Sequence, residues 1–177
     1  MAIIVETGTA AADSEVLCSV AFADTYHAGL GNTLWATLLT AEKEAALRRA
    51  YAYMTQTYRM RWTGYRVKAT QALDWPRQQV PRTDVYSGYG GNMGTWGNYY
   101  PYDAIPLELQ QANAECAFKA ASGEMLADVD PPVASESVGP ISVTYFQGDT
   151  KTKRYPAIDR LLMPFLSGGG NIRLTRA

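Results

Sequence analysis

Apolar residues at helical spacing predict that most of the chain is helical. The strongest pattern lies between residues 40 and 58 and repeats every three or four positions: Leu47, Ala50, Tyr51, Met54 and Tyr58. Thr40 is expected to cap this helix, with Glu42 and Glu44 in a first turn whose dipole favours acids. We therefore predict a long amphipathic helix that ends at about Tyr58.

Two further helices are predicted on either side of it. Ser19 is the expected N-cap of a helix that runs to about residue 28 and is stopped by glycines at 29 and 31. Residues 32–39 indicate a turn that places Trp35 in the core. Pro106 opens an alanine-rich helix that runs to about Ser122, because proline is favoured in a first helical turn.

The last third of the chain has a different pattern. Residues 141–146 alternate between apolar and polar side chains, which predicts a strand. A C-terminal helix is predicted from one apolar face: Ile158, Leu161, Leu162, Phe165 and Leu166. Pro164 is expected to kink or fray that helix. Residues 168–170 predict a flexible hinge, and residues 171–177 predict a basic, extended tail.

These elements predict a mainly α fold, a small bundle of about four helices with a protruding β-strand or hairpin and an extended C-terminal tail. Residues 1–18 are interpreted as an extended N-terminal arm. Residues 19–128 form the helical core, and residues 129–177 hold a linker, the strand, the C-terminal helix and the tail. The core includes a long Gly- and Tyr-rich loop at 82–104.

The loop has no hydrophobic period, and loops of this length are uncommon unless they bind a partner. Rigid aromatic side chains separated by glycines are typical of adaptable contact surfaces. The expected contact residues are Tyr86, Tyr89, Trp96, Tyr99 and Tyr100.

Residues 59–77 combine aromatic and basic side chains in the sequence RMRWTGYRVKATQALDWPR. Gly64 breaks the segment, and residues 70–74 are expected to form one helical turn before the Trp75-Pro76 pair. This residue mixture suits stacking on nucleic-acid bases and equally suits protein contacts. Our preferred interpretation makes Trp35, Trp62 and Trp75 core residues, the latter two joining the helices of 40–58 and 106–122. Contacts with a neighbouring subunit or a DNA channel are then expected from Arg59, Arg61, Arg66 and Lys68.

Charge is unevenly distributed along the chain. The net charge is −1, yet residues 48–82 carry eight Lys and Arg and one acid, Asp74, so that segment is +7 and the remainder is −8. Such polarity favours binding of a polyanion or of another copy of the chain. Pairing of these charges within the fold is an equally open alternative.

The sequence offers no recognisable catalytic or metal site. His27 is the single histidine and is expected to be either a surface residue or a satisfied packing residue. Cys18 and Cys116 lack metal-ligand spacing and are expected to be reduced. Residues 88–97 fit neither a phosphate-binding loop nor a dinucleotide fingerprint. The chain shows no leader and no apolar run that could span a bilayer. We expect a soluble, unsecreted protein without enzymatic activity or a cofactor.

A series of motifs occurs in order along residues 19–177, outside the loop at 82–104: ADTYHAGLGN with Trp35, AEKEAALRRAYAYM, RWTGYR, QALDWPR, Ile105-Pro106, VGPISVTY and YPAIDRLLMPFL. In this order they resemble the head–tail connector (adaptor) family of tailed bacteriophages. Many members of that family carry the label of DnaT-like single-stranded-DNA-binding proteins.

The resemblance implies a structural virion protein at the head–tail interface, present in the host cytoplasm during assembly. Copies would form a ring, usually a dodecamer, beneath the portal protein. The ring would extend the channel through which genomic double-stranded DNA passes loosely, and would dock the next tail component. The family has no catalytic residues. Its C-terminal region engages the portal, which corresponds here to Tyr155, Leu161, Leu162, Phe165, Ile172, Arg173, Leu174 and Arg176. The alternative is a single-stranded-DNA-binding protein of the replication type, suggested by the basic aromatic segment.

Overall fold

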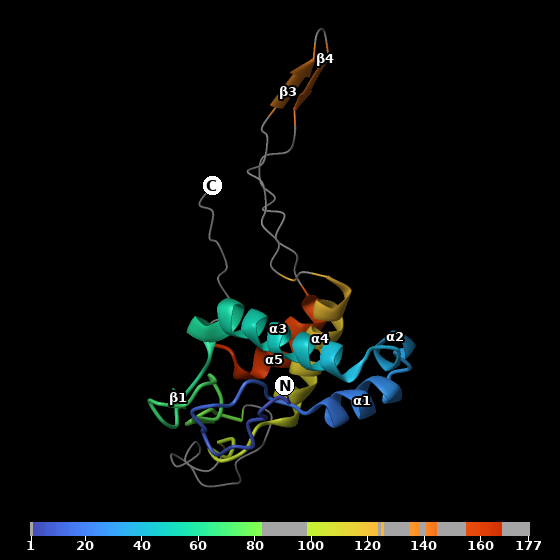
Figure 1. The fold of residues 1–177 in the computed structure, drawn as a ribbon. Coiled ribbons are helices and arrows are strands. Elements are labelled where there is room, and N and C mark those ends of the chain that lie inside the picture. The colour runs from blue at the N-terminus through green and yellow to red at the C-terminus, as the bar shows by residue number, and fades with distance from the viewer. Residues whose placement is uncertain are drawn as a thin grey trace, which may run out of the picture.

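A helical body and a separate hairpin make up the computed structural model, which describes residues 2–82, 99–123, 125, 135–138, 141–144 and 155–167. Within these ranges, five α-helices form the body and a two-stranded hairpin stands clear of it (Figure 1). The predicted mainly helical bundle with a protruding hairpin is confirmed. Predictions for Tyr86, Tyr89 and Trp96 and for residues 168–177 lie outside the described part of the chain.

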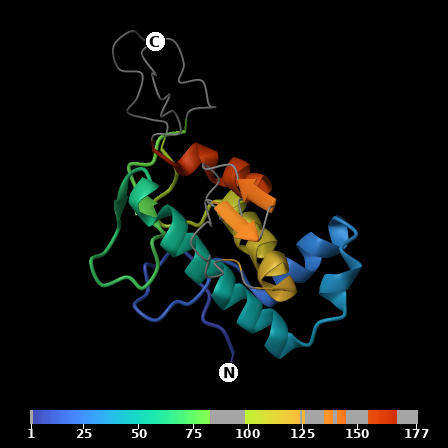
Figure 2. The same cartoon turned by 90° about the horizontal axis from the view of Figure 1, so that it is seen from above.

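Helices α3 (Thr40–Tyr58) and α4 (Leu107–Ser122) form the centre of the body and lie side by side (Figures 1 and 2). Both helices bury alanines, which allow their backbones to approach closely: Ala46, Ala50, Ala112, Ala114 and Ala117. The bounds of both helices confirm the predicted ones. Pro106, however, precedes α4 as its N-cap residue and does not lie within the first turn.

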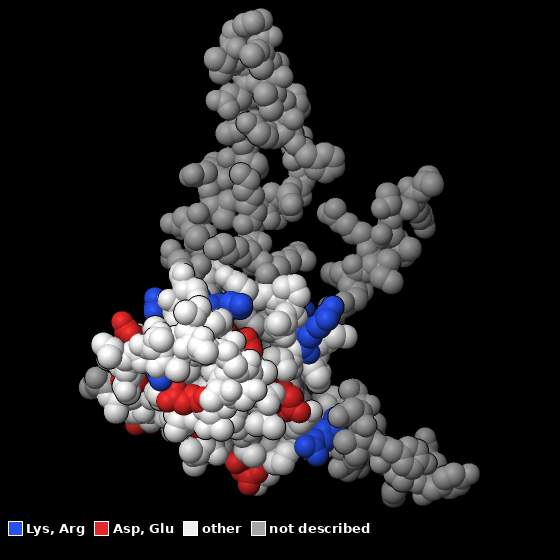
Figure 3. Space-filling model, turned by 90° about the vertical axis from the view of Figure 1, so that its right-hand side faces the viewer, with Lys and Arg blue, Asp and Glu red and all other residues white. Residues whose placement is uncertain are grey.

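Helices α1 (Val20–Gly29) and α2 (Thr33–Ala36) pack at the N-terminal end of α3, the end that faces the viewer in Figure 3. The predicted cap at Ser19 is confirmed, because its Oγ accepts a hydrogen bond from the Phe22 N–H at 3.1 Å. Trp35 is buried as predicted. The N-cap of α3 is Leu39, one residue before the expected Thr40. The Leu39 N–H donates a hydrogen bond to the Glu42 carboxylate at 2.8 Å.

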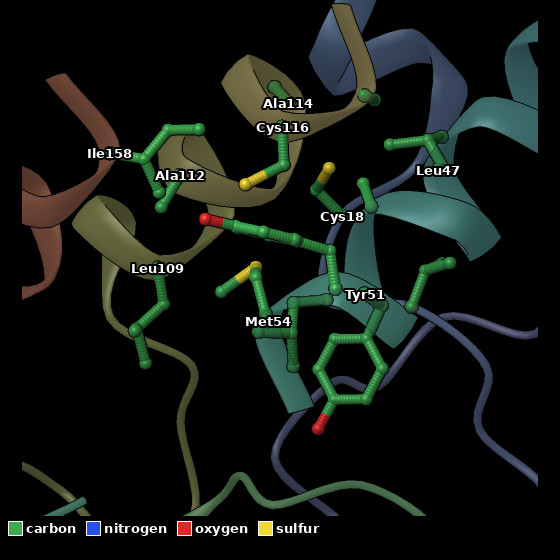
Figure 4. Packing of buried hydrophobic residues seen from close by; sticks show 14 of the residues in the cluster. Cys18, Leu47, Tyr51, Met54, Leu109, Ala112, Ala114, Cys116 and Ile158 are labelled. Carbon is green, nitrogen blue, oxygen red and sulfur yellow. The ribbon is translucent and has the colours of Figure 1, made fainter. Parts of the chain in front are cut away.

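The core between these helices also contains polar groups that hold it in register. Asn113 accepts a hydrogen bond from the Leu17 N–H at 3.1 Å and donates to the Leu47 carbonyl at 3.4 Å. One side chain therefore ties α4 to α3 and to the segment before α1. Cys18 and Cys116 lie in the same interior among leucine, methionine and tyrosine side chains (Figure 4), and both are free thiols.

The C-terminal helix α5 (Pro156–Leu162) belongs to this core and packs on α4. Ile158, Leu162 and Phe165 are fully buried, which confirms the predicted apolar face. The helix gives way to a 3-10 turn, η2 (Met163–Phe165), at the position where Pro164 cannot donate an α-helical hydrogen bond. The fray expected at Pro164 is thus a tightened turn, and it keeps Phe165 in the core.

The N-terminal segment folds back on the body, so the prediction of an extended arm for residues 1–18 is wrong. Val16, Leu17 and Cys18 are buried, and the Glu6 N–H donates to the Val16 carbonyl at 2.9 Å. Four groups donate to the buried Glu6 carboxylate at 2.9–3.0 Å: the backbone N–H groups of Gly8, Ala10 and Ala11, and the Ser14 hydroxyl. These donors close residues 6–14 into a loop around one carboxylate.

Gly8 shows why this loop fits closely against the chain that leads into α4. Its φ of +105° favours glycine, and a Cβ atom there would lie 1.9 Å from the Asp103 carbonyl oxygen. The loop therefore rests on residues 103–104 with no room for a side chain.

Two short antiparallel pairs complete the fold. Strand β1 (Tyr65–Arg66) pairs with β2 (Arg77–Gln78) inside the body. Strand β3 (Ser135–Val138) pairs with β4 (Ile141–Thr144) in the projecting hairpin, with Val138 opposite Ile141. The predicted strand at 141–146 is confirmed for its described residues. The SESV sequence of β3 has no alternating apolar pattern of its own, so the sequence located only the second strand of the hairpin.

Replacing Glu6 with Gln should lower the free energy of unfolding at pH 7 by about 1–3 kcal/mol, because an amide cannot accept from all the donors that surround the carboxylate. Burial opposes ionisation of Glu6, but hydrogen bonds from Ser14, Gly8, Ala11 and Ala10 outweigh it and lower the carboxyl pKa below its ordinary 4.5. This stabilisation is complete above the unfolded-state pKa and is lost as pH falls through the lower folded-state value.

Urea unfolding at pH 7 and pH 3 tests this expectation. The difference between wild type and Glu6→Gln should narrow at pH 3. The matched control is Asp13→Asn in the same loop, where the side chain is exposed; its effect should stay within about 0.5 kcal/mol. An equal effect of the two variants at pH 7 would contradict the role given to Glu6.

Candidate functional site

Residues 59–77, which the sequence singles out, form a folded turn at the C-terminal end of α3. The helix passes into a 3-10 turn, η1 (Arg59–Arg61), and Gly64 then takes a φ of +66°. A Cβ atom at Gly64 would lie 2.3 Å from the Gln78 carbonyl oxygen, so the close approach of β1 and β2 requires glycine.

The helical turn predicted for residues 70–74 is wrong, because that stretch forms bends around the Gln71 side chain. Gln71 is buried and donates to the Leu73 carbonyl at 2.8 Å and the Pro76 carbonyl at 3.1 Å, while it accepts from the Lys68 N–H. The Gln71 side-chain amide thus provides hydrogen-bond partners for backbone groups that would pair with one another in a helix.

An edge-to-face row of aromatic rings runs through this turn. The ring centroids of Trp62 and Trp75 are 5.9 Å apart, and Trp75 meets Phe165 at 5.4 Å. Trp75 is fully buried and Trp62 is 7% exposed, which confirms both as core residues. Backbone bonds from Thr63 N–H to the Phe165 carbonyl and from Ser167 N–H to the Arg61 carbonyl close the same junction. The aromatic row therefore joins the end of α3 to the C-terminal segment, where α4 had been the expected partner.

Several basic side chains of the segment hold backbone within the fold. The Arg77 guanidinium donates to three carbonyls, those of Thr63 at 2.8 Å, Gly64 at 2.7 Å and Asp74 at 3.3 Å. Burial lowers the pKa of this guanidinium. Arg66 donates to the Gln71 carbonyl, and the Lys68 ammonium donates to the Thr9 carbonyl at 2.8 Å.

Arg59 and Arg61 lie at the surface. Arg59 places its Nε 3.3 Å from the buried Asp74 carboxylate while about half of its side chain, 52%, stays exposed. The Arg61 guanidinium lies over the Tyr58 ring, 5.9 Å from the centroid. Of the four predicted contact residues, Arg59, Arg61 and Lys68 are exposed and Arg66 is half-buried. Arg66 and Lys68 donate to carbonyls of the chain.

Some residues predicted to contact partners are core residues. Leu162 and Phe165 are fully buried, so their side chains hold α5 in place and are not exposed to a portal. Tyr155 and Leu161 are half-buried. In the partner-contact loop, Tyr99 is exposed, but Tyr100 is buried with its ring 4.9 Å from that of Phe165. Aromatic and apolar composition alone did not separate core from contact positions.

The groups with reactive side chains are packed and neutral. His27 is fully buried, its Nε2 lies 3.1 Å from the Ala114 carbonyl, and its Nδ1 lies 3.0 Å from the Asn32 amide nitrogen. Burial lowers the imidazole pKa, and the hydrogen bonds fit a neutral ring with its proton on Nε2. Burial also raises the pKa of the Cys18 thiol to about 12 and that of Cys116 above its ordinary range.

The described part of the body includes a larger and a smaller hollow. The larger, about 570 Å³, lies between α3 and α4 beside Arg49, Tyr53 and Gln56, and the smaller, about 360 Å³, lies beside Trp35 and Lys43. Among the described residues, no group of three or more His, Cys, Asp or Glu side chains is placed to hold a metal ion. None of the helices in the described ranges is long and apolar enough to cross a membrane.

The acid of the basic segment 48–82 fixes one of its arginines. Asp74 is the single acid among eight basic residues of segment 48–82, and the structure buries it beside Arg59. A lone acid in a basic segment indicates an ion pair that fixes one arginine. No comparable pattern marks Gln71, whose role depends on the fold of the turn.

Taken together, the fold and this surface define a small, mainly helical protein with arginines exposed at one end of its longest helix and a two-stranded hairpin outside its body. The model of the family described as "Putative DnaT-like ssDNA binding protein" matches residues 1–177, and the chain belongs to that family. No curated protein and no solved structure gives a significant match.

Replacing Trp75 with Ala should lower the free energy of unfolding by about 3–5 kcal/mol, because the fully buried ring would leave a cavity at the aromatic junction. Denaturant unfolding measures the change. Met60→Ala serves as control, since this neighbouring side chain is 93% exposed and its loss should change stability by no more than about 0.5 kcal/mol. A Trp75→Ala protein as stable as the control would disprove the junction.

Arg77→Lys should cost about 1–3 kcal/mol of stability, because an ammonium cannot reproduce the fork that reaches three carbonyls. Arg61→Lys should leave stability unchanged, since the Arg61 side chain is exposed. Thermal and urea unfolding of the two variants side by side give the comparison. Equal losses in both would mean that the structural and surface arginines are assigned wrongly.

Proposed function

We propose that this protein is a head–tail adaptor of a tailed bacteriophage, a structural virion component that forms a ring beneath the portal protein. In that role it extends the channel for genomic DNA and docks the next tail component. The motif series along residues 19–177 suggests this role. The observation that carries it here is the β3–β4 hairpin, which stands clear of the helical body (Figure 1).

An isolated two-stranded hairpin is at best marginally stable in water, because it lacks a third strand or a helix against which to bury a face. Within the described residues, β3 and β4 form a two-stranded sheet, and each strand has one edge free for pairing. Free edges favour the addition of a strand from another chain. A hairpin of this kind suits a subunit that completes its structure on assembly.

The buried tryptophans argue in the same direction. Single-stranded-DNA-binding surfaces stack bases on exposed aromatic rings beside basic side chains. Trp62 and Trp75 are buried, and Arg66, Lys68 and Arg77 are engaged with backbone carbonyls. Much of the +7 segment therefore stabilises the fold. Loose contact with passing double-stranded DNA requires fewer exposed basic and aromatic side chains than tight binding of a single strand.

A second candidate function is binding of single-stranded DNA. It is favoured by the description of the family and by Tyr65, which is 66% exposed in the same segment as Arg61. One tyrosine and one arginine could stack and pair with a short stretch of DNA. This function requires tight binding of single-stranded DNA, whereas the adaptor role does not.

Mixing the protein with the portal ring of the same phage, followed by mass measurement, tests the adaptor role. Wild type should add several copies to the portal ring. A variant with residues 135–144 replaced by a Gly-Ser linker should keep the melting temperature of the helical body and lose stable attachment. Wild-type protein that never joins portal rings would overturn the proposal.

The same preparation distinguishes the second candidate by fluorescence anisotropy with a labelled single-stranded oligonucleotide. Specific single-strand binding would show a log–log salt dependence with a slope of about −0.7 per phosphate contacted. It would also weaken markedly in Arg61→Ser. Tight, Arg61-dependent binding together with no portal attachment would replace the adaptor role with the DNA-binding one.

A further inference from the structure

We infer that copies of this chain associate end to end through the two opposite ends of helix α3, an inference that rests on the proposed ring. The N-terminal end of α3 presents exposed leucines with acidic side chains, here called the acidic end. The C-terminal end presents exposed methionines with arginines, here called the basic end. Each surface fits the other and not itself.

The acidic end is formed by α1, α2 and the first turns of α3. Three exposed leucines fall within ten residues there: Leu30 at 55%, Leu34 at 68% and Leu39 at 70%. Glu42 is exposed and Glu44 is half-buried in the α3 turns beside them. Lys43, the basic residue between them, is largely buried and is paired with Asp24 at 2.9 Å. Figure 3 looks onto this end, where acidic and basic side chains are both scattered over a mostly uncharged surface.

The basic end is formed by η1 and η2, which lie against one another through the Ser167–Arg61 and Thr63–Phe165 backbone bonds. Met60 is 93% exposed on η1, and Met163 is 69% exposed on η2. Arg59 and Arg61 flank Met60. Arg59 pairs with the buried Asp74 carboxylate at 3.3 Å but keeps 52% of its side chain exposed. Unbranched methionine side chains adapt readily to an apolar partner surface.

The position of the two ends fixes the type of assembly. Helix α3 has 19 residues and is about 28 Å long, so one copy cannot bring its own two ends together. Both ribbon views place α1 and α2 at one end of α3 and η2 at the other (Figures 1 and 2). A contact between unlike ends is heterologous and leaves one free surface of each kind on every growing chain. Such a contact closes into a ring when its rotation permits.

Charge and apolar character support the pairing of acidic end with basic end. Leucines of one copy would cover methionines of the next, while Glu42 and Glu44 would face Arg59 and Arg61. Opposite charges at the rim of an apolar contact fix its register and disfavour the pairing of like ends. Two acidic ends or two basic ends would instead bring like charges together.

One-sided variants test this contact. Leu34→Arg blocks the acidic end, and Met60→Glu with Arg61→Glu blocks the basic end; all three positions are exposed, so folding should be retained. Like-charge contact should weaken self-association of each variant at least about tenfold, measured by sedimentation velocity with and without portal rings. Mixed one to one, the two variants should form heterodimers through the unaltered end of each.

The control is Ala52, exposed at the middle of α3, where Ala52→Arg and Ala52→Glu should associate like wild type. Complete rings on the portal from both one-sided variants would overturn the end-to-end contact and leave the adaptor role intact. Wild type that associates end to end but ignores portal rings would support the contact and overturn the adaptor role. Wild-type copies that associate in neither setting would overturn the contact.

Discussion

The edge-to-face contact of Trp75 with Trp62 and Phe165 is the interaction on which the rest of this fold depends. It joins both ends of the turn after α3 to the segment that follows α5, about 90 residues further along the chain. With this junction closed, η1 lies against η2 and the arginines of the turn have carbonyls within reach. Without it, α5 would lose its anchor at Phe165, and the surface that presents Met60 and Arg61 would lose its support.

The sequence predicted the helices well because they depend on local signals. The spacing of Leu47, Met54 and Tyr58 identified α3, Ser19 marked the start of α1, and Pro106 marked the start of α4. Failures occurred where side chains replace backbone partners over longer distances. The N-terminal loop closes around Glu6, and the turn at 70–74 closes around Gln71. A single buried polar residue leaves no periodic pattern, so neither structure was visible in the sequence.

The candidate site shows the same division. Burial of Trp62 and Trp75 was predicted from the Gly and Pro residues that punctuate their segment. The +7 charge, by contrast, did not reveal which arginines would bind carbonyls and which would stay at the surface. Arg77 and Arg61 are indistinguishable by composition, and only the turn that brings Thr63 and Gly64 to Arg77 separates them. An uneven distribution of charge along a sequence therefore indicates that a charged surface exists, but it does not identify which residues form that surface.

The two buried cysteines allow opening of the core to be measured by thiol labelling. Cys18 and Cys116 are fully enclosed between α4 and the segment before α1, and burial keeps both thiols protonated at neutral pH. Alkylating reagents act on the thiolate and need access to the sulfur. Labelling of either cysteine therefore requires the helices to separate, and its rate follows the population of opened molecules. If the core of a subunit opens less often once the subunit has joined a ring, both cysteines would be labelled more slowly, although they lie in the core and not at the surface.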